Sequence, residues 1–148
     1  MTYCTQSDIE AIWPPDDLLA SIDDDASGTL SATEEGYITR AIERAANLIN
    51  ARLEIRYSLA DLASNEWCRD ANAAIAAYLL STRQGAAAPA HLQQQYTAYV
   101  ADLGEIAAGR LKVPDAPETH ESGPTVTNFN VDLSQPHRKA QRIEETST

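Results

Sequence analysis

Residues 32–53 read ATEEGYITRAIERAANLINARL, and this stretch decides the fold. Its apolar residues recur at the three- and four-residue spacing of an α-helix and line one face of it. They are Ile38, Ala41, Ile42, Ala45, Leu48, Ile49 and Leu53. A helix of this length extends about 33 Å, at about 1.5 Å per residue. A rod with one apolar face needs other helices to pack against, which predicts a helical bundle.

Two short helices are expected before this rod. The sequence Ser7-Asp8-Ile9-Glu10 has the form of a capping box, which predicts a helix that starts at Ser7. Pro14 ends that helix, because proline cannot continue the hydrogen-bond ladder. A second short helix is expected over residues 16–22, since its first residues are acidic and suit a helix N-terminus.

Two longer helices are expected after the rod. One runs from about Ser64, which can cap it, to about Arg83. Its apolar face would be Trp67, Ala71, Ala74, Ile75, Tyr78 and Leu79. The other runs from Pro89, which suits a first turn, to about Ala108. Its face would be Leu92, Tyr96, Tyr99, Val100, Leu103 and Ile106. The expected fold class is all-α: a small bundle of three longer helices with short N-terminal helices.

The character of the chain changes after residue 114. Prolines and a glycine punctuate a polar stretch that is typical of a linker. We therefore expect a helical domain over residues 1–114, and a linker with an extended C-terminal arm over residues 115–148. Residues 127–133, TNFNVDL, alternate between apolar and polar side chains, which predicts a β-strand in that arm.

A single strand is not stable alone, so the arm is expected to add its strand to another molecule. The alternative is a tail without fixed structure, in which the alternation is chance. A short basic cluster follows the strand pattern and is too small to argue for nucleic-acid binding. An ion-pair contact with an acidic neighbour explains it at least as well. The candidate partner-binding residues are Phe129, Val131, Leu133, Arg138, Lys139 and Arg142.

The net charge of −11 is concentrated at the N-terminus. Residues 1–35 carry nine acids and no Lys or Arg, whereas residues 36–115 carry eight acids and eight bases. A negative surface repels phosphate backbones, which argues against tight or sequence-specific nucleic-acid binding. Solubility is the alternative explanation of the same charge.

The two cysteines, Cys4 and Cys68, form no C-x-x-C pair, which argues against a zinc site and a disulfide scaffold. No apolar run approaches the roughly 20 residues that span a bilayer, so no membrane contact is expected. The first residues lack the pattern of a signal peptide. We expect a protein that is cytoplasmic where it is made.

Residues 23–34, DDDASGTLSATE, fit the spacing of a calcium-binding loop. The ligands would be Asp23, Asp25, Ser27, Thr29 through its carbonyl, and Glu34. The alternative is an acidic loop whose side-chain oxygens cap the following helix. No cofactor is expected to be obligatory, and calcium, if bound, would stiffen the loop.

Enzymatic chemistry finds no support in the residue pattern, and the sequence predicts no catalytic residue. The histidines are isolated, and no phosphate-binding or dinucleotide glycine pattern occurs. Arginines do recur near every fourth position, at Arg40, Arg44, Arg52 and Arg56. They either pair with carboxylates of an adjacent copy or form a solvated face.

Several short segments, taken in order, resemble a family of proteins from Mu-like and other long-tailed bacteriophages. The first is a start with Met1, Tyr3, Thr5 and Asp8, followed by a short helix and acidic glycine loop over residues 18–28. The next are Leu53, Arg56, Tyr57 and Leu59, then Cys68 with Ala77, Tyr78, Leu79 and Leu80. The last is a helix with Tyr96 and Tyr99 that closes on Ala108, Gly109 and Leu111. The likeness covers about residues 1–114.

That family is similar to head-completion proteins, and the resemblance implies a structural virion protein. The implied role is a head-tail adaptor subunit, in which copies (commonly twelve) form a ring between the portal protein and the stopper or tail-completion protein, around the DNA channel. The implied location is the head-tail interface of the virion. The competing hypothesis is a small calcium-binding regulatory domain that uses the loop at residues 23–34.

Overall fold

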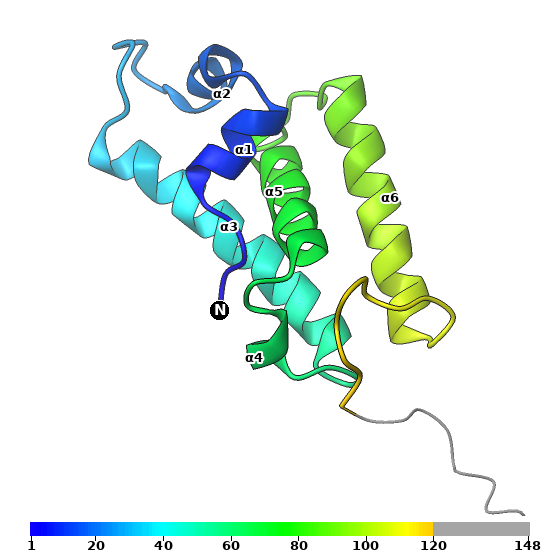
Figure 1. The fold of residues 1–148 in the computed structure, drawn as a ribbon. Coiled ribbons are helices and arrows are strands. Elements are labelled where there is room, and N and C mark those ends of the chain that lie inside the picture. Colours follow the sequence, from blue (N-terminus) through cyan, green and yellow to red (C-terminus); the bar gives the residue numbers. More distant parts are fainter. Residues whose placement is uncertain (120–148) are drawn as a thin grey trace, which may run out of the picture.

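The computed structural model describes residues 1–119, and six helices make up most of them (Figure 1). They are α1 (Gln6–Ile12), α2 (Pro15–Ile22), α3 (Ala32–Leu53), α4 (Leu59–Leu62), α5 (Glu66–Ser81) and α6 (Ala90–Ala107). The predicted all-α body of three longer helices with short N-terminal helices is confirmed for this part of the chain. The short helix α4 was not predicted.

Helix α5 lies between α3 and α6 and forms the centre of the bundle (Figure 1). Every residue from 71 to 77 is buried, and most of them are alanines. Small side chains allow the neighbouring helices to approach α5 from several sides. The sequence predicted a single apolar face on this helix, whereas the structure encloses it almost all round.

One buried polar residue ties the N-terminal segment to the bundle. The side-chain oxygen of Asn72 accepts hydrogen bonds from the backbone N–H groups of Tyr3, at 2.9 Å, and Cys4, at 3.2 Å. Its amide nitrogen donates to the carbonyl of Ile42 on α3, at 3.0 Å. Because a buried amide must be hydrogen-bonded, Asn72 fixes three segments at one point.

Two helix starts differ from those predicted. Helix α1 begins after Thr5, whose backbone N–H donates to the carboxylate of Asp8 at 2.7 Å, so Thr5 takes the capping role predicted for Ser7. Helix α5 begins after Asn65, whose side chain accepts from the N–H of Cys68, in place of Ser64. Both starts offered several capping side chains within two or three residues, and periodicity alone could not choose between them.

No strand occurs within residues 1–119, and no helix there has the length and apolar character needed to cross a bilayer. The β-strand predicted over residues 127–133 lies outside the described residues, as do all six candidate partner-binding residues of the C-terminal arm.

Candidate functional site

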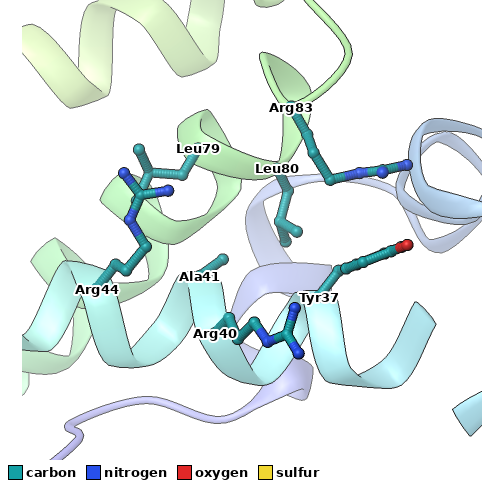
Figure 2. A pocket seen from close by; sticks show the side chains of 7 residues that line it. All are labelled: Tyr37, Arg40, Ala41, Arg44, Leu79, Leu80 and Arg83. Atoms are coloured by element: carbon teal, nitrogen blue, oxygen red, sulfur yellow. The ribbon is translucent and has the colours of Figure 1, made fainter. Parts of the chain in front are cut away.

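A groove of about 260 Å³ opens between α3 and the C-terminal end of α5 (Figure 2). Ala41, Leu79 and Leu80 give it an apolar floor, and the guanidinium groups of three arginines surround that floor. The arginines are Arg40, Arg44 and Arg83. We call this feature the arginine groove. It places positive charge around an apolar surface in a chain whose net charge is −11.

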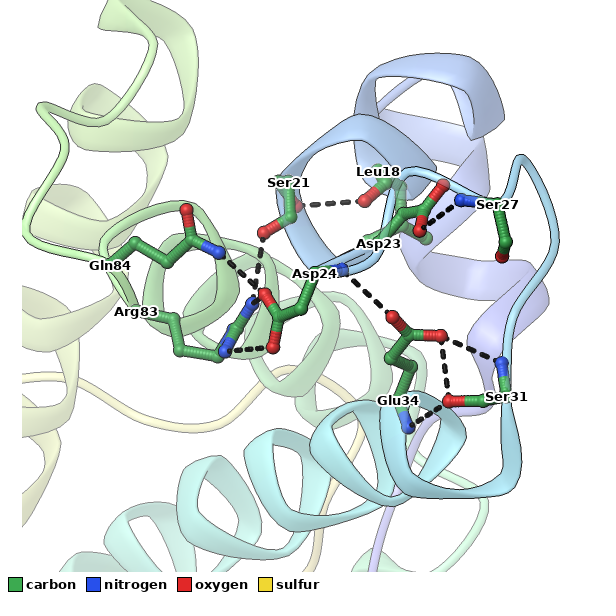
Figure 3. Close-up of polar contacts among 9 residues, drawn as sticks. All are labelled: Leu18, Ser21, Asp23, Asp24, Ser27, Ser31, Glu34, Arg83 and Gln84. Carbon is green, nitrogen blue, oxygen red and sulfur yellow. Dashed lines mark hydrogen bonds and ion pairs between the residues drawn. The ribbon is translucent and has the colours of Figure 1, made fainter.

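One of the three arginines is already paired. The guanidinium of Arg83 binds the carboxylate of Asp24 at 2.5 and 3.2 Å, and donates to the carbonyl of Ser21 at 3.4 Å (Figure 3). It also lies 4.3 Å from the centre of the Tyr37 ring, a cation–π contact. The Arg83 guanidinium holds the pKa of Asp24 below its usual value. These contacts attach the acidic loop to the end of α5.

The loop of residues 23–34 is organised by hydrogen bonds from its own backbone (Figure 3). The Asp23 carboxylate accepts from the N–H groups of Ser27, at 3.0 Å, and Gly28, at 2.8 Å. Gly28 has a φ of +76°, a conformation that glycine adopts at little cost. These N–H donors, that of Gly28 foremost, lower the pKa of Asp23.

Glu34 closes the other end of the loop and caps α3. Its carboxylate accepts from the N–H of Asp24, at 2.8 Å, and from the N–H and hydroxyl of Ser31, at 2.7 and 2.8 Å (Figure 3). The Ser31 side chain in turn accepts from the N–H of Glu34, which completes a capping box. The N–H of Ser31, with its hydroxyl, lowers the pKa of Glu34.

The structure brings the carboxylates among the predicted calcium ligands together. Carboxylate oxygens of Asp23, Asp25 and Glu34 lie within 4.8 Å of one another, as a cation site would require. The Ser27 hydroxyl donates to the Thr29 carbonyl at 2.8 Å. The residues could therefore hold calcium, while the capping hydrogen bonds account for the loop without it.

A second polar cluster holds the last described residues against the bundle. The guanidinium of Arg56 donates to the carboxylate of Glu118 at 2.8 Å, and both side chains are largely buried. The carbonyl of Arg56 accepts from the N–H and the hydroxyl of Thr119, at 3.0 and 3.1 Å. We call this cluster, with Tyr57, the Arg56 latch. The chain thus contacts the helical body beyond the boundary expected at residue 114.

Tyr57 and Gly109 complete the latch. The Tyr57 hydroxyl accepts from the N–H of Val113 at 3.0 Å and donates to Glu118 at 3.3 Å. Burial raises the pKa of this hydroxyl, so it stays protonated. Gly109 has a φ of +81°, and a Cβ placed on it would lie 2.3 Å from the Arg56 guanidinium. The left-handed backbone at this position favours glycine, and any larger residue would also displace the Arg56 guanidinium.

Sequence reasoning identified Arg40 and Arg44 but missed Arg83 and Glu118. Helical spacing placed Arg40 and Arg44 on one helix. The partners of Arg83 and Glu118, which are Asp24 and Arg56, lie far away in the sequence. Arg56, expected on the same stripe as Arg40 and Arg44, is buried instead, because the chain turns after α3 and brings it under the end of α6.

Fold and surfaces together define the class: a small protein whose residues 1–119 form a helical body with an arginine groove, an acidic N-terminal surface, and a C-terminal stretch held by the Arg56 latch. The family model described as Bacteriophage Mu, Gp36 matches residues 3–131, and the chain belongs to this family. Membership indicates a phage structural or morphogenesis protein. Searches of curated proteins and of solved structures found no match.

Proposed function

We propose that this protein is a non-enzymatic head-tail adaptor subunit. Copies, twelve in the expected case, would form a ring that joins the portal protein to the stopper or tail-completion protein around the DNA channel of the virion. Membership of a phage family supports this proposal, and so does a rigid helical body that carries an anchored C-terminal segment.

The observation that carries the proposal is the Arg56 latch. It binds Glu118 and Thr119 just after α3, so the described chain ends at a fixed point on the body. A ring subunit that reaches a neighbour needs such a fixed origin, because a defined starting point lowers the entropy lost when the arm binds. Under this proposal Phe129, Val131 and Leu133 pair with a neighbouring edge, and Arg138, Lys139 and Arg142 meet its acids.

The acidic N-terminal surface fits a passage for DNA. Residues 1–35 carry nine acids and no Lys or Arg, and part of this surface would face the channel. DNA would then pass without the counterion-releasing contacts that make it adhere to basic surfaces.

Electron microscopy of the protein mixed with the portal protein of its own phage tests the proposal. We expect a ring of this protein beneath the portal, with density for residues 120–148 on a neighbouring subunit. A protein that stays monomeric and unattached with the portal, under conditions where tailed particles assemble, would contradict the adaptor role.

A further inference from the structure

Two cations of the arginine groove have no partner in their own body. Within residues 1–119, neither Arg40 nor Arg44 forms an ion pair or a hydrogen bond to a carboxylate, and both side chains are exposed. Arg83, by contrast, is bound to Asp24. The apolar floor between them includes Ala41 and Leu80, which are almost fully buried, and the half-buried Leu79. The groove therefore suits a convex element that carries small or apolar side chains and carboxylates.

Helix α2 has this chemistry on its outer side. Asp16, Asp17 and Ala20 are exposed, and Leu18 and Ile22 on the opposite side are buried against the body. At 3.6 residues per turn, the three exposed residues share one face. That face points away from its own bundle, so it cannot enter a groove on the same body. Only another molecule can bring such a helix to the arginine groove.

We propose that the arginine groove of one copy receives α2 of a second copy, with Asp16 and Asp17 beside Arg40 and Arg44. The contact is heterologous, because two different surfaces meet, and its repetition can close a ring. The proposal rests on the proposed function in one respect: it names the contact between neighbouring subunits of the adaptor ring.

Charge favours α2 of a second copy over the C-terminal segment as the occupant. Residues 120–148 carry four acids and three bases, a net charge of −1 spread over 29 residues, whereas α2 carries two acids and no base within eight residues, a net charge of −2. Complementary charge steers association and selects the partner surface. Glu43 and Arg52 are also exposed on α3 but do not line the groove, so they provide matched positions for control substitutions.

A charge exchange tests the contact. One variant carries Arg40→Glu and Arg44→Glu, and the other carries Asp16→Lys and Asp17→Lys. In the first variant the groove and α2 are both negative, and in the second both are positive, so neither variant should form the contact alone. In a mixture, the groove of each variant meets an α2 of opposite charge from the other. Arg52→Glu is the control and should behave as the unaltered protein.

Cysteine crosslinking provides the readout. Ala20→Cys lies on the exposed face of α2, and Asn47→Cys lies one turn beyond Arg44 on α3; both positions are exposed. The native Cys4 and Cys68 are buried and will not compete. We expect the two single-cysteine proteins to crosslink to each other far more than either does to Lys112→Cys. The yield should fall at least roughly tenfold with either charge-reversed variant, because like charges across an interface are strongly unfavourable. It should recover in their mixture.

The outcomes separate this contact from the adaptor role. Rings on the portal without the Ala20–Asn47 crosslink would overturn the contact and leave the function standing. The crosslink without any ring on the portal would support the contact and overturn the function. A crosslink from Asn47→Cys to Val131→Cys, with none to Ala20→Cys, would assign the groove to the C-terminal segment and overturn the contact. Crosslinking of Asn47→Cys to the portal protein alone would assign the groove to the portal and would also overturn the contact.

Discussion

The guanidinium of Arg56 and the carboxylate of Glu118 lie 2.8 Å apart, although 62 positions separate them in the sequence. Their side chains are only 8% and 16% exposed, so water does little to screen the pair. Lys112 adds a weaker contact to the same carboxylate, at 3.7 Å. The pair joins the end of α3 to the last described residues and closes the bundle.

Removal of one partner of this pair should destabilise the fold. Glu118→Ala leaves the buried Arg56 charge without its carboxylate, which typically costs about 3–5 kcal/mol. We expect a loss near the lower end of that range in the free energy of unfolding, measured by urea titration, because Lys112 shows that one side of the site reaches solvent. The exposed pair of Glu105 and Arg110 is the control, and Glu105→Ala should change stability far less. Equal losses for the two variants would refute a special role for the latch.

Gly109 provides a second test of the same cluster. Gly109→Ala must place a Cβ at a φ of +81° and against the Arg56 guanidinium. The left-handed conformation alone costs roughly 1–2 kcal/mol for a residue other than glycine. The matched control is Gly104→Ala, at a helical position of α6 with open space around it. This control should gain roughly 0.5–1 kcal/mol, since alanine favours a helix. Thermal unfolding of both variants should therefore shift in opposite directions.

Much of the bundle could be predicted from the sequence, because the signals that define a helix lie within a few neighbouring residues. The helix predicted over residues 32–53 begins and ends at these residues in the structure. Its apolar periodicity and its capping residues are both local properties of the sequence. The latch could not be predicted, since nothing near Arg56 identifies Glu118 as its partner. The burial of α5 on nearly all sides could not be predicted either, because a run of alanines is compatible with one buried face or with several. Three residues on which the family resemblance rested, Arg56, Tyr57 and Gly109, meet in the latch.

The acidic loop should make the stability of the fold depend on pH. Backbone N–H donors lower the pKa of Asp23 and Glu34 in the folded protein. A carboxyl group with a depressed folded pKa stabilises the fold above its unfolded pKa, about 4, and loses that contribution as pH falls through the folded value. We expect Glu34→Gln to reduce the loss of stability on acidification from pH 6 to pH 3, measured by urea unfolding at each pH.

The same variant distinguishes capping from calcium binding. Since the hydrogen bonds to Ser31 and Asp24 need no metal, Glu34→Gln should destabilise the protein equally in chelator and in millimolar calcium. A rise in the unfolding temperature of the unaltered protein with calcium, abolished by Glu34→Gln, would instead favour the calcium-binding alternative.

Both cysteines should be inert in the folded protein. Burial raises the pKa of Cys4 and of Cys68 to about 12, with the charge of Asp8 adding to the effect at Cys4. At pH 8 only about one thiol in 10⁴ is then ionised, and the thiolate is the reactive form. A chromogenic disulfide reagent should therefore modify neither cysteine until denaturant is added, whereas Asn47→Cys should react at once. Rapid modification of the native protein would show that the N-terminal segment opens away from Asn72.

Two truncations separate the body from the arm. A chain that ends at residue 119 keeps Glu118 and Thr119, so we expect it to stay folded and to be more stable than a chain that lacks them. A chain that ends at residue 116 loses the Glu118 carboxylate and both hydrogen bonds of Thr119, so it should be destabilised at least as much as Glu118→Ala. Circular dichroism during urea unfolding measures both.

If the arm serves assembly, the stable 1–119 chain should still fail to join the portal, as particle imaging would show. Normal tailed particles from that chain would mean that residues 120–148 are dispensable, and that the latch serves stability alone.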